Sequence, residues 1–211
     1  MISEPGPCND CIGIILAGGL ARRMGGGDKP LVEIEGRPIL QHVIDRLKPQ
    51  CRLLAINANG DPARFARFRL PVVADSIEDF AGPLAGVLAG MDFAADRGAA
   101  HVLSAPGDTP FLPADLVSRL DAARSRAGAD IAVAASDGRT HHAVALWPVA
   151  LREDLRRALV EKGERKVSAF IGGFANVVVE WPVEPYDPFF NVNRPEDLVR
   201  AAVIAKAESR G

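Results

Sequence analysis

Apolar runs of strand length alternate with segments of helical period along almost the whole chain. The first run, 12–16, is followed after a glycine-rich stretch by Leu40, Val43, Ile44 and Leu47, which share one helical face. Further expected strands are 53–56, 72–74, 101–105, 131–135, 143–147 and 177–181, and further helices are expected in 61–70, 149–161 and 166–171 and from Pro83, Pro113 and Pro195 onward. This alternation predicts an α/β fold with a mostly parallel sheet covered by helices on both faces.

Length and charge limit the classes of protein to consider. A chain of 211 residues corresponds to about one domain, which we place at 11–207, after a disordered tail at 1–10. That tail has no basic region or apolar core, and no run reaches the ~18–20 apolar residues of a membrane span. Without a signal peptide or a membrane span, we expect a cytoplasmic protein, and a net charge of −2 argues against nucleic-acid or membrane-surface binding.

The three cysteines indicate no special chemistry. Cys8 and Cys11 form a CxxC pair, but it precedes the first strand and no second pair completes a zinc site. We interpret them as incidental.

The stretch 16–29 has the composition of an anion-binding loop. It contains five glycines and three cations, Arg22, Arg23 and Lys29. Glycine lets successive backbone N–H groups approach an anion, and the cations add charge toward phosphate oxygens. The alternative is a flexible turn with solvated arginines.

Polar residues follow several of the predicted strands. Asn57, Asp75, Asp108 and Asn193 each come after one. In open α/β sheets the ligand lies outside the carboxyl ends of the strands, so we expect these residues at one edge, together with the glycine-rich loop.

The loop matches neither of the two best-known nucleotide loops. GxxxxGK[ST] is absent because Pro30 follows Lys29, and GxGxxG is absent too. Its Gly-Gly turn, Arg-Met-Gly and lysine resemble the opening signature of the Rossmann-like nucleotidyltransferases. The loop is most similar to that of the molybdenum cofactor guanylyltransferase family, and further matches are 57–59, 75–76, 82–86, 108–110, 163–167, 191–193 and 195–198.

This resemblance implies a three-layer Rossmann-like nucleotidyltransferase fold and an activity. Such enzymes use Mg²⁺ to transfer GMP from GTP to the terminal phosphate of Mo-molybdopterin, which gives molybdopterin guanine dinucleotide and pyrophosphate. The attacking phosphate oxygen is already ionised, so catalysis needs alignment and charge compensation rather than a strong base. Molybdoenzyme chaperones or molybdenum-insertion proteins are the partners that the resemblance suggests.

The resemblance also assigns the nucleotide side. Lys29 is expected to contact the triphosphate with help from Arg23, while Arg22 has no assigned role. Backbone or side-chain contacts with the nucleotide are expected at Leu16, Ala17, Gly18, Gly19, Asn57, Asp75, Gly82 and Pro83. Asp75 suits a ribose hydroxyl, the guanine edge or a loop cap, and the sequence leaves these open.

Asp108 is the residue we expect to hold Mg²⁺. It follows a buried strand, Gly107 leaves space beside it, and its oxygens are the hard ligands that Mg²⁺ prefers. The alternative is a turn-capping aspartate in Gly-Asp-Thr-Pro. Asn193 stands where relatives of the wider group often have a second acidic metal ligand, and a turn residue is the alternative there.

Residues late in the chain are candidates for the pterin side. They are Arg165, Lys166, Asn191 and Asn193. For Arg165 and Lys166 the alternative is a solvated charge cluster. His141 and His142 lack a third metal ligand nearby, so we expect a hydrogen-bonding role in the acceptor site or plain loop positions.

Two other functions compete with the guanylyltransferase. One is a CTP-dependent relative, either a molybdopterin cytidylyltransferase or a sugar nucleotidyltransferase. The other is a non-catalytic nucleotide sensor or cofactor carrier, against which Asp108 and Lys29 argue.

Overall fold

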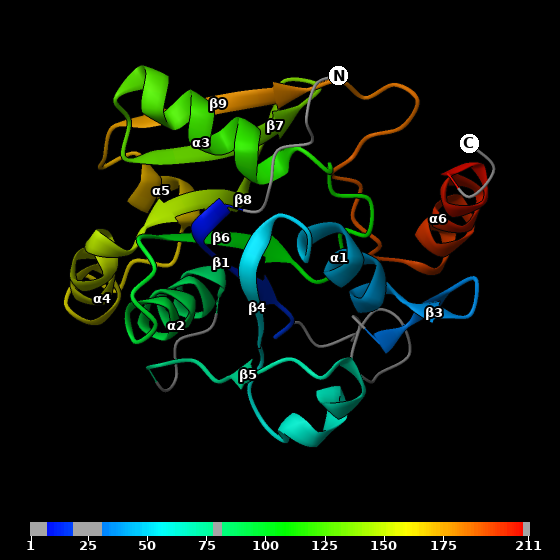
Figure 1. Cartoon of the computed structure of the whole chain (residues 1–211), viewed down its shortest axis with the longest axis horizontal. Helices are drawn as coiled ribbons and strands as arrows, with labels where there is room; N and C mark the ends of the chain where they lie inside the picture. The colour runs from blue at the N-terminus through cyan, green and yellow to red at the C-terminus, as the bar shows by residue number, and fades with distance from the viewer. Residues whose placement is uncertain (1–7, 19–30, 78–81, 209–211) are drawn as a thin grey trace.

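A seven-stranded sheet forms the centre of the chain, which the computed structural model describes over residues 8–18, 31–77 and 82–208 (Figure 1). Its order is β5-β4-β1-β6-β8-β7-β9. The strands are β1 (Cys8–Leu16), β4 (Cys51–Asn57), β5 (Val72–Val73), β6 (His101–Pro106), β7 (Ile131–Ser136), β8 (Arg139–Pro148) and β9 (Asn176–Trp181). All neighbouring pairs in this order are parallel except the two that β8 makes. The predicted α/β fold with a mostly parallel sheet is therefore confirmed.

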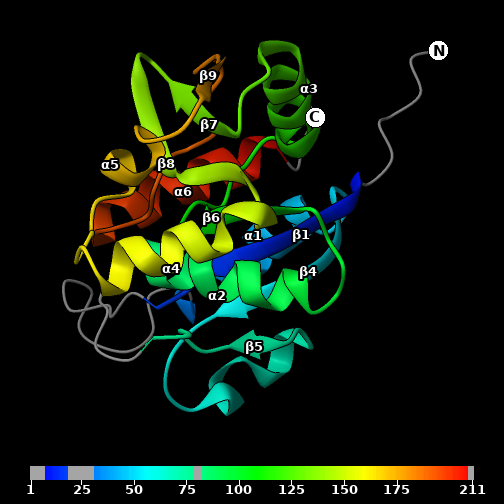
Figure 2. The same ribbon diagram turned by 90° about the vertical axis from the view of Figure 1, so that its left-hand side faces the viewer.

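Helices cover both faces of the sheet and make three layers (Figure 2). One face carries α1 (Ile39–Leu47) and α3 (Leu116–Ala127); the other carries α2 (Pro83–Ala95), α4 (Arg152–Val160) and α5 (Val167–Ile171). In β1, Cys11 and Ile15 pack toward α1, whereas Ile12 and Ile14 pack toward α2. Because successive side chains point to opposite faces, a strand covered on both sides has to be apolar throughout.

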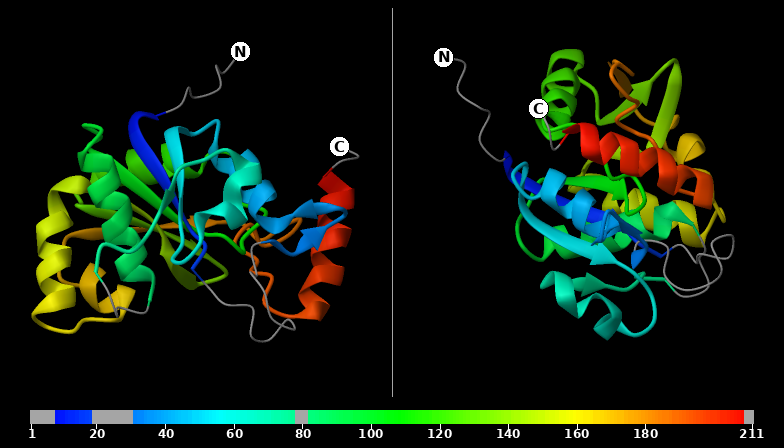
Figure 3. Two further views of the ribbon diagram at one scale, coloured as in Figure 1. Left: turned by 90° about the horizontal axis from the view of Figure 1, so that it is seen from below. Right: turned by 90° about the vertical axis from the view of Figure 1, so that its right-hand side faces the viewer.

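A smaller core joins the last helix to a hairpin beside the sheet. Helix α6 (Pro195–Glu208) lies next to strands β2 (Glu33–Ile34) and β3 (Arg37–Pro38), as both panels of Figure 3 show. Ile34 packs there with Phe111, Val192 and Ile204. Phe111 comes just after Asp108, and Val192 lies between two predicted site asparagines, so this cluster fixes both segments.

Two short 3-10 helices complete the fold. The segment expected to be helical at 61–70 is the 3-10 helix η2 (Pro62–Phe68), and η3 (Val149–Leu151) precedes α4. Within the described ranges, no helix is both long and apolar enough to cross a membrane.

Some boundaries differ from the prediction. Strand β1 begins at Cys8, inside the tail expected at 1–10, and the Asp10 carboxylate accepts a hydrogen bond from Ala100 N–H at 2.9 Å. Residues 1–7 lie outside the described ranges. Helix α3 begins at Leu116 rather than at Pro113. The Gln50 side chain caps this end, because its Nε2 atom donates to Pro113 O at 2.8 Å and its Oε1 atom accepts from Val117 N–H at 3.0 Å.

Strand β8 also starts earlier than predicted, at Arg139. His141 and His142 therefore lie on a strand and not in a loop. The cause is pairing with β7, in which Ser136 lies opposite Arg139 and Ala134 opposite His141.

Candidate active site

The carboxyl ends of β1, β4 and β6 meet at one edge of the sheet, as predicted. Ala17 N–H donates to Asn57 O at 2.9 Å, and Gly107 N–H donates to Leu16 O at 3.0 Å. These bonds fix the backbone where it enters the glycine-rich loop, with Gly18 exposed. The other predicted residues of the loop, Gly19, Arg23 and Lys29, lie outside the described ranges, as does Arg22.

Asp75 is held by two asparagines. Asn57 Nδ2 donates to Asp75 Oδ1 at 2.9 Å and Asn59 Nδ2 donates to Asp75 Oδ2 at 2.7 Å. Asn59 Oδ1 in turn accepts from Asp75 N–H at 2.9 Å. The structure thus brings Asn57 and Asp75 together, as predicted, and adds Asn59. Its place in the Asn-Ala-Asn motif at the end of β4 was the available signal in the sequence.

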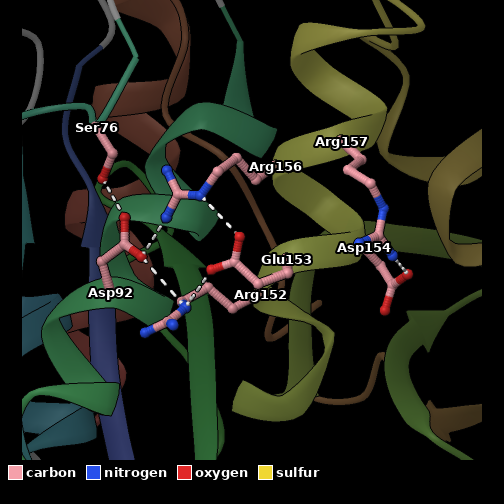
Figure 4. Close-up of polar contacts among 7 residues, drawn as sticks. All are labelled: Ser76, Asp92, Arg152, Glu153, Asp154, Arg156 and Arg157. Atoms are coloured by element: carbon pink, nitrogen blue, oxygen red, sulfur yellow. Dashed lines mark hydrogen bonds and ion pairs between the residues drawn. The ribbon is translucent and has the colours of Figure 1, made fainter.

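The loop that carries Asp75 is also anchored to α2 and α4 (Figure 4). Ser76 Oγ donates to Asp92 Oδ2 at 2.5 Å, and Asp92 Oδ1 forms an ion pair with Arg156 at 2.7 Å and a longer one with Arg152 at 3.6 Å. These side chains are partly buried, so their ion pairs are screened less than fully exposed ones. The network fixes the position of Ser76, the residue next to Asp75.

Helix α2 presses its first turns against the strand ends. A Cβ atom added at Gly86 would lie 2.2 Å from Asn57 Oδ1 and 2.7 Å from Leu16 Cδ2. One turn later, a Cβ at Gly90 would lie 2.8 Å from Ile14 Cγ2. Glycine at these positions therefore permits an approach that no other residue allows, and it places the helix N-terminus beside the predicted nucleotide residues.

Gly82 and Arg165 are neighbours. Gly82 has a φ of 133°, which favours glycine, and a Cβ there would lie 3.9 Å from the Arg165 carbonyl oxygen. Pro83 is the first residue of α2. Arg165, which was expected on the pterin side, thus adjoins the predicted nucleotide side.

The backbone at Arg165 and Lys166 is fixed by Glu164. Its Oε1 atom accepts from Arg165 N–H and Lys166 N–H, both at 2.8 Å. The N–H groups of Lys166 and then Arg165 lower the pKa of the Glu164 carboxyl. Both cationic side chains are exposed, and their role toward the second substrate stays a prediction.

Asp108 lies between β6 and the segment that follows β9. Its carbonyl oxygen accepts from Val192 N–H at 2.9 Å, and its Oδ1 atom is buried. Beside it, fully buried Thr109 donates from Oγ1 to Asn191 Oδ1 at 2.6 Å. The structure therefore brings Asp108 and Asn191 together, and it adds Thr109, which the motif Asp-Thr-Pro contained.

Asn193 does not directly follow a strand, as had been expected. Strand β9 ends at Trp181, and the segment 182–194 carries Asn193 to the start of α6. Its N–H and that of Arg194 donate to Asp197 Oδ2 at 2.7 and 2.8 Å, so Asp197 caps α6 from inside its first turn. Asn193 as a metal ligand stays a prediction.

The described residues contain no ready-made multidentate metal site. No group of three or more His, Cys, Asp or Glu side chains among them is placed to hold an ion. Cys11 is buried beside Cys51, and hydrogen bonding to that thiol and burial raise the pKa of Cys11. A thiol held protonated in the core is a poor metal ligand and nucleophile.

Comparisons with known proteins show what the chain is similar to. The family model of the MobA-like NTP transferase domain matches residues 13–175. Proteins called molybdenum cofactor guanylyltransferase are 62% identical over 199 residues in Rhodopseudomonas palustris strain BisB5 (93% of this chain, 95% of the relative) and 56% identical over 200 residues in Bradyrhizobium sp. strain ORS 278 (94% of each).

Solved structures are similar too. Molybdopterin-guanine dinucleotide biosynthesis protein A from Archaeoglobus fulgidus is similar with a TM-score of 0.71 and 25% identity, covering 93% of this chain and 99% of that one. A CMP:2-keto-3-deoxy-manno-octonic acid synthetase complexed with CTP is similar with a TM-score of 0.69, covering 94% of this chain and 98% of that one. Its 14% identity supports the nucleotidyltransferase fold alone.

Proposed function

This chain belongs to the family of MobA-like NTP transferase domains, and we propose that it is a molybdenum cofactor guanylyltransferase. It transfers GMP from GTP to the terminal phosphate of Mo-molybdopterin, with molybdopterin guanine dinucleotide and pyrophosphate as products. The observation that carries the proposal is the similarity, over nearly the whole chain, to relatives of that name. The family predicted from the spaced motifs is thereby confirmed.

The reaction joins two polyanions. A terminal phosphate oxygen of Mo-molybdopterin forms a bond to the α-phosphorus of GTP, and the bond from that phosphorus to the oxygen bridging the α- and β-phosphates breaks. The electron pair leaves with pyrophosphate. Because the attacking oxygen is already ionised, the reaction requires no strong base. What the protein supplies is alignment of the two substrates and compensation of their charge.

The residues around Asp108 suit Mg²⁺. Asp108 supplies one carboxylate, and Asn193 on the neighbouring segment is the candidate for a second, amide oxygen ligand; both are hard oxygen ligands. Mg²⁺ keeps waters and substrate phosphates as ligands, so it does not require three protein carboxylates. When bound, the ion would offset charge on the phosphates, while Asp108 holds it at the end of β6.

The nucleotide lies, in this proposal, over the ends of β1 and β4. Backbone groups of Leu16, Ala17 and Gly18 and the first turn of α2 at Gly82 and Pro83 form its surroundings. Asn57 orients the Asp75 carboxylate toward the ribose or the guanine edge, and the phosphate contacts are assigned to Arg23 and Lys29 on the resemblance. The restriction of Asp75 by two amides supports this role, since an acceptor that reads a ligand must be held in place.

A competition assay tests the function. The chain is incubated with Mg²⁺, Mo-molybdopterin and equal concentrations of GTP, CTP, ATP and UTP, and the dinucleotide products are identified by mass spectrometry. We expect the guanine dinucleotide to predominate. Equal or better use of CTP would overturn the guanylyltransferase in favour of a cytidylyltransferase, and no product at all would favour a non-catalytic role. Transfer of the product to molybdoenzyme chaperones or insertion proteins is a separate proposal, which rests on resemblance.

A further inference from the structure

His141 is the end of a hydrogen-bonded chain that the reaction described above does not use. Its Nε2 atom lies 2.7 Å from Ser136 Oγ, and Ser136 Oγ lies 2.8 Å from Asp187 Oδ1. Ser136 is buried at the end of β7, and Asp187 Oδ1 also accepts from Phe189 N–H at 2.9 Å. The Phe189 ring lies against the imidazole, with 4.7 Å between ring centroids. The hydrogen bonds among His141, Ser136 and Asp187, with the Phe189 ring, therefore fix both the position and the rotation of the imidazole.

These hydrogen bonds also determine which ring nitrogen of His141 carries the proton. A carboxylate only accepts, so the single hydroxyl proton of Ser136 goes to Asp187. Ser136 Oγ must then accept from His141, which puts a proton on Nε2. In the neutral ring the other nitrogen, Nδ1, has a lone pair and accepts hydrogen bonds. Nδ1 makes no hydrogen bond with the described residues, and the side chain is only partly buried.

Burial favours the neutral ring. Desolvation lowers the pKa of His141, and the nearby charges act in both directions: Asp187 and Glu180 raise the pKa, while Arg139 and His142 lower it. These groups come from β8, β9 and the segment after β9. The result is an imidazole that presents an acceptor near neutral pH.

His141 lies at the same edge of the sheet as the candidate active site. Strand β8 is the neighbour of β6, and their ladder ends with Ser104 opposite Ala145, so His141 lies beyond the end of that ladder on the side where β6 leads to Asp108. Strands β4 and β5, with Asn57 and Asp75, lie on the other side of β6. From Asp187, the chain leads within a few residues to the Val192 N–H that binds the Asp108 carbonyl oxygen.

We propose that His141 binds the second substrate, with Nδ1 accepting a hydrogen bond from a ring N–H or amino group of the pterin. This role rests on the proposed function and deepens it. Because it lies across Asp108 from Asn57 and Asp75, His141 is placed to contact a second substrate whose terminal phosphate reacts beside Asp108. Ser136 and Asp187 act as positioning residues, because they reach the substrate only through the imidazole.

Two substitutions separate the proposed role from a structural one. In His141→Gln the amide nitrogen takes the place of Nε2 and keeps the bond to Ser136, but the acceptor at Nδ1 is lost. In His141→Asn the amide oxygen takes the place of Nδ1, but the bond to Ser136 is lost. We expect His141→Gln to raise the KM for Mo-molybdopterin by roughly three- to tenfold, as for one net hydrogen bond, with the KM for GTP unchanged, and His141→Asn to raise it less. The opposite order would show a structural role and overturn the proposal.

The pH dependence and Ser136→Ala give independent readouts. For the parent chain we expect the KM for Mo-molybdopterin to rise as pH falls through the pKa of His141, because protonation of Nδ1 removes the acceptor. A KM that falls with pH would instead indicate a charged imidazole on a phosphate and overturn the proposal. Ser136→Ala should raise the same KM and leave the KM for GTP unchanged, since Nε2 then loses the partner that fixes its proton. A parent that makes no dinucleotide overturns the proposed function and this role with it, whereas an active parent and a His141→Gln variant with parental KM overturn this role alone.

Discussion

Substitution of Gly86 by alanine tests whether the contact between α2 and the strand ends controls nucleotide binding. The new methyl group would lie 2.2 Å from Asn57 Oδ1 and 2.7 Å from Leu16 Cδ2. Both neighbours are predicted nucleotide residues, and neither can stay in place. The Asn57 amide has to turn away from Asp75 or α2 has to move outward.

The size of the effect follows from what is lost. Overpacking a core position costs about 1–3 kcal/mol of stability, and alanine returns up to about 1 kcal/mol over glycine in a helix. The net loss of unfolding free energy from packing is therefore about 0–3 kcal/mol, and the chain should fold. The hydrogen bond from Asn57 to the Asp75 carboxylate contributes about 1.5–3 kcal/mol to holding that carboxylate in place. If GTP binding requires Asp75 in this orientation, loss of the bond should weaken GTP binding roughly 10- to 150-fold.

Gly90→Ala is the matched control. Its methyl group would lie 2.8 Å from Ile14 Cγ2, on the same helix and against the same strand but away from Asn57. Urea denaturation would measure the stability of each variant, and isothermal titration calorimetry would measure its affinity for GTP. We expect both variants to lose stability and only Gly86→Ala to lose affinity. A folded Gly86→Ala variant with parental affinity, or an equal loss in Gly90→Ala, would refute the reasoning.

Three further outcomes are expected. Asp108→Asn keeps the shape of the side chain but removes its charge, so kcat should fall on the order of 10²–10³-fold. The measurement is a Mg²⁺ titration of the rate, and a parental rate at low Mg²⁺ would remove the metal assignment. Thr109→Val removes the hydroxyl that fixes Asn191, and steady-state kinetics should show a higher KM for Mo-molybdopterin with an unchanged KM for GTP; a change confined to GTP would contradict this. Burial lowers the pKa of His42 and of His101, so the stability they contribute is complete above the unfolded-state pKa of about 6.5 and is lost as pH falls through their folded-state pKa values. Urea denaturation from about pH 8 to about pH 5.5 should show that loss, and it should be smaller when both are replaced by glutamine; an equal loss would assign it to other groups.

Much of the site was predictable because its signals are local. Asn57, Asp75 and Asp108 follow apolar runs of strand length, and in parallel strands the residues after such runs meet at one edge. The Gly-Pro start of α2 was equally visible, since Pro83 fits the first turn of a helix. Asn59 and Thr109 stood inside recognised motifs, but nothing local distinguished a side chain that positions another from a turn residue.

The sequence alone determined the α/β class, the helices and strands with their buried faces, and the family, because periodicity and spaced motifs depend only on neighbouring residues. Strand order, and with it the placement of Asp108 between the Asn57–Asp75 pair and His141, was decided by the tertiary structure. The same holds for the segment after β9. Its Val192 N–H donates to the Asp108 carbonyl oxygen, and its Asn191 accepts a hydrogen bond from Thr109, 82 residues earlier in the chain. The close approach of α2 at Gly86 depends on packing of the whole helix against the sheet. Such contacts join residues far apart in the chain, so no local pattern records them.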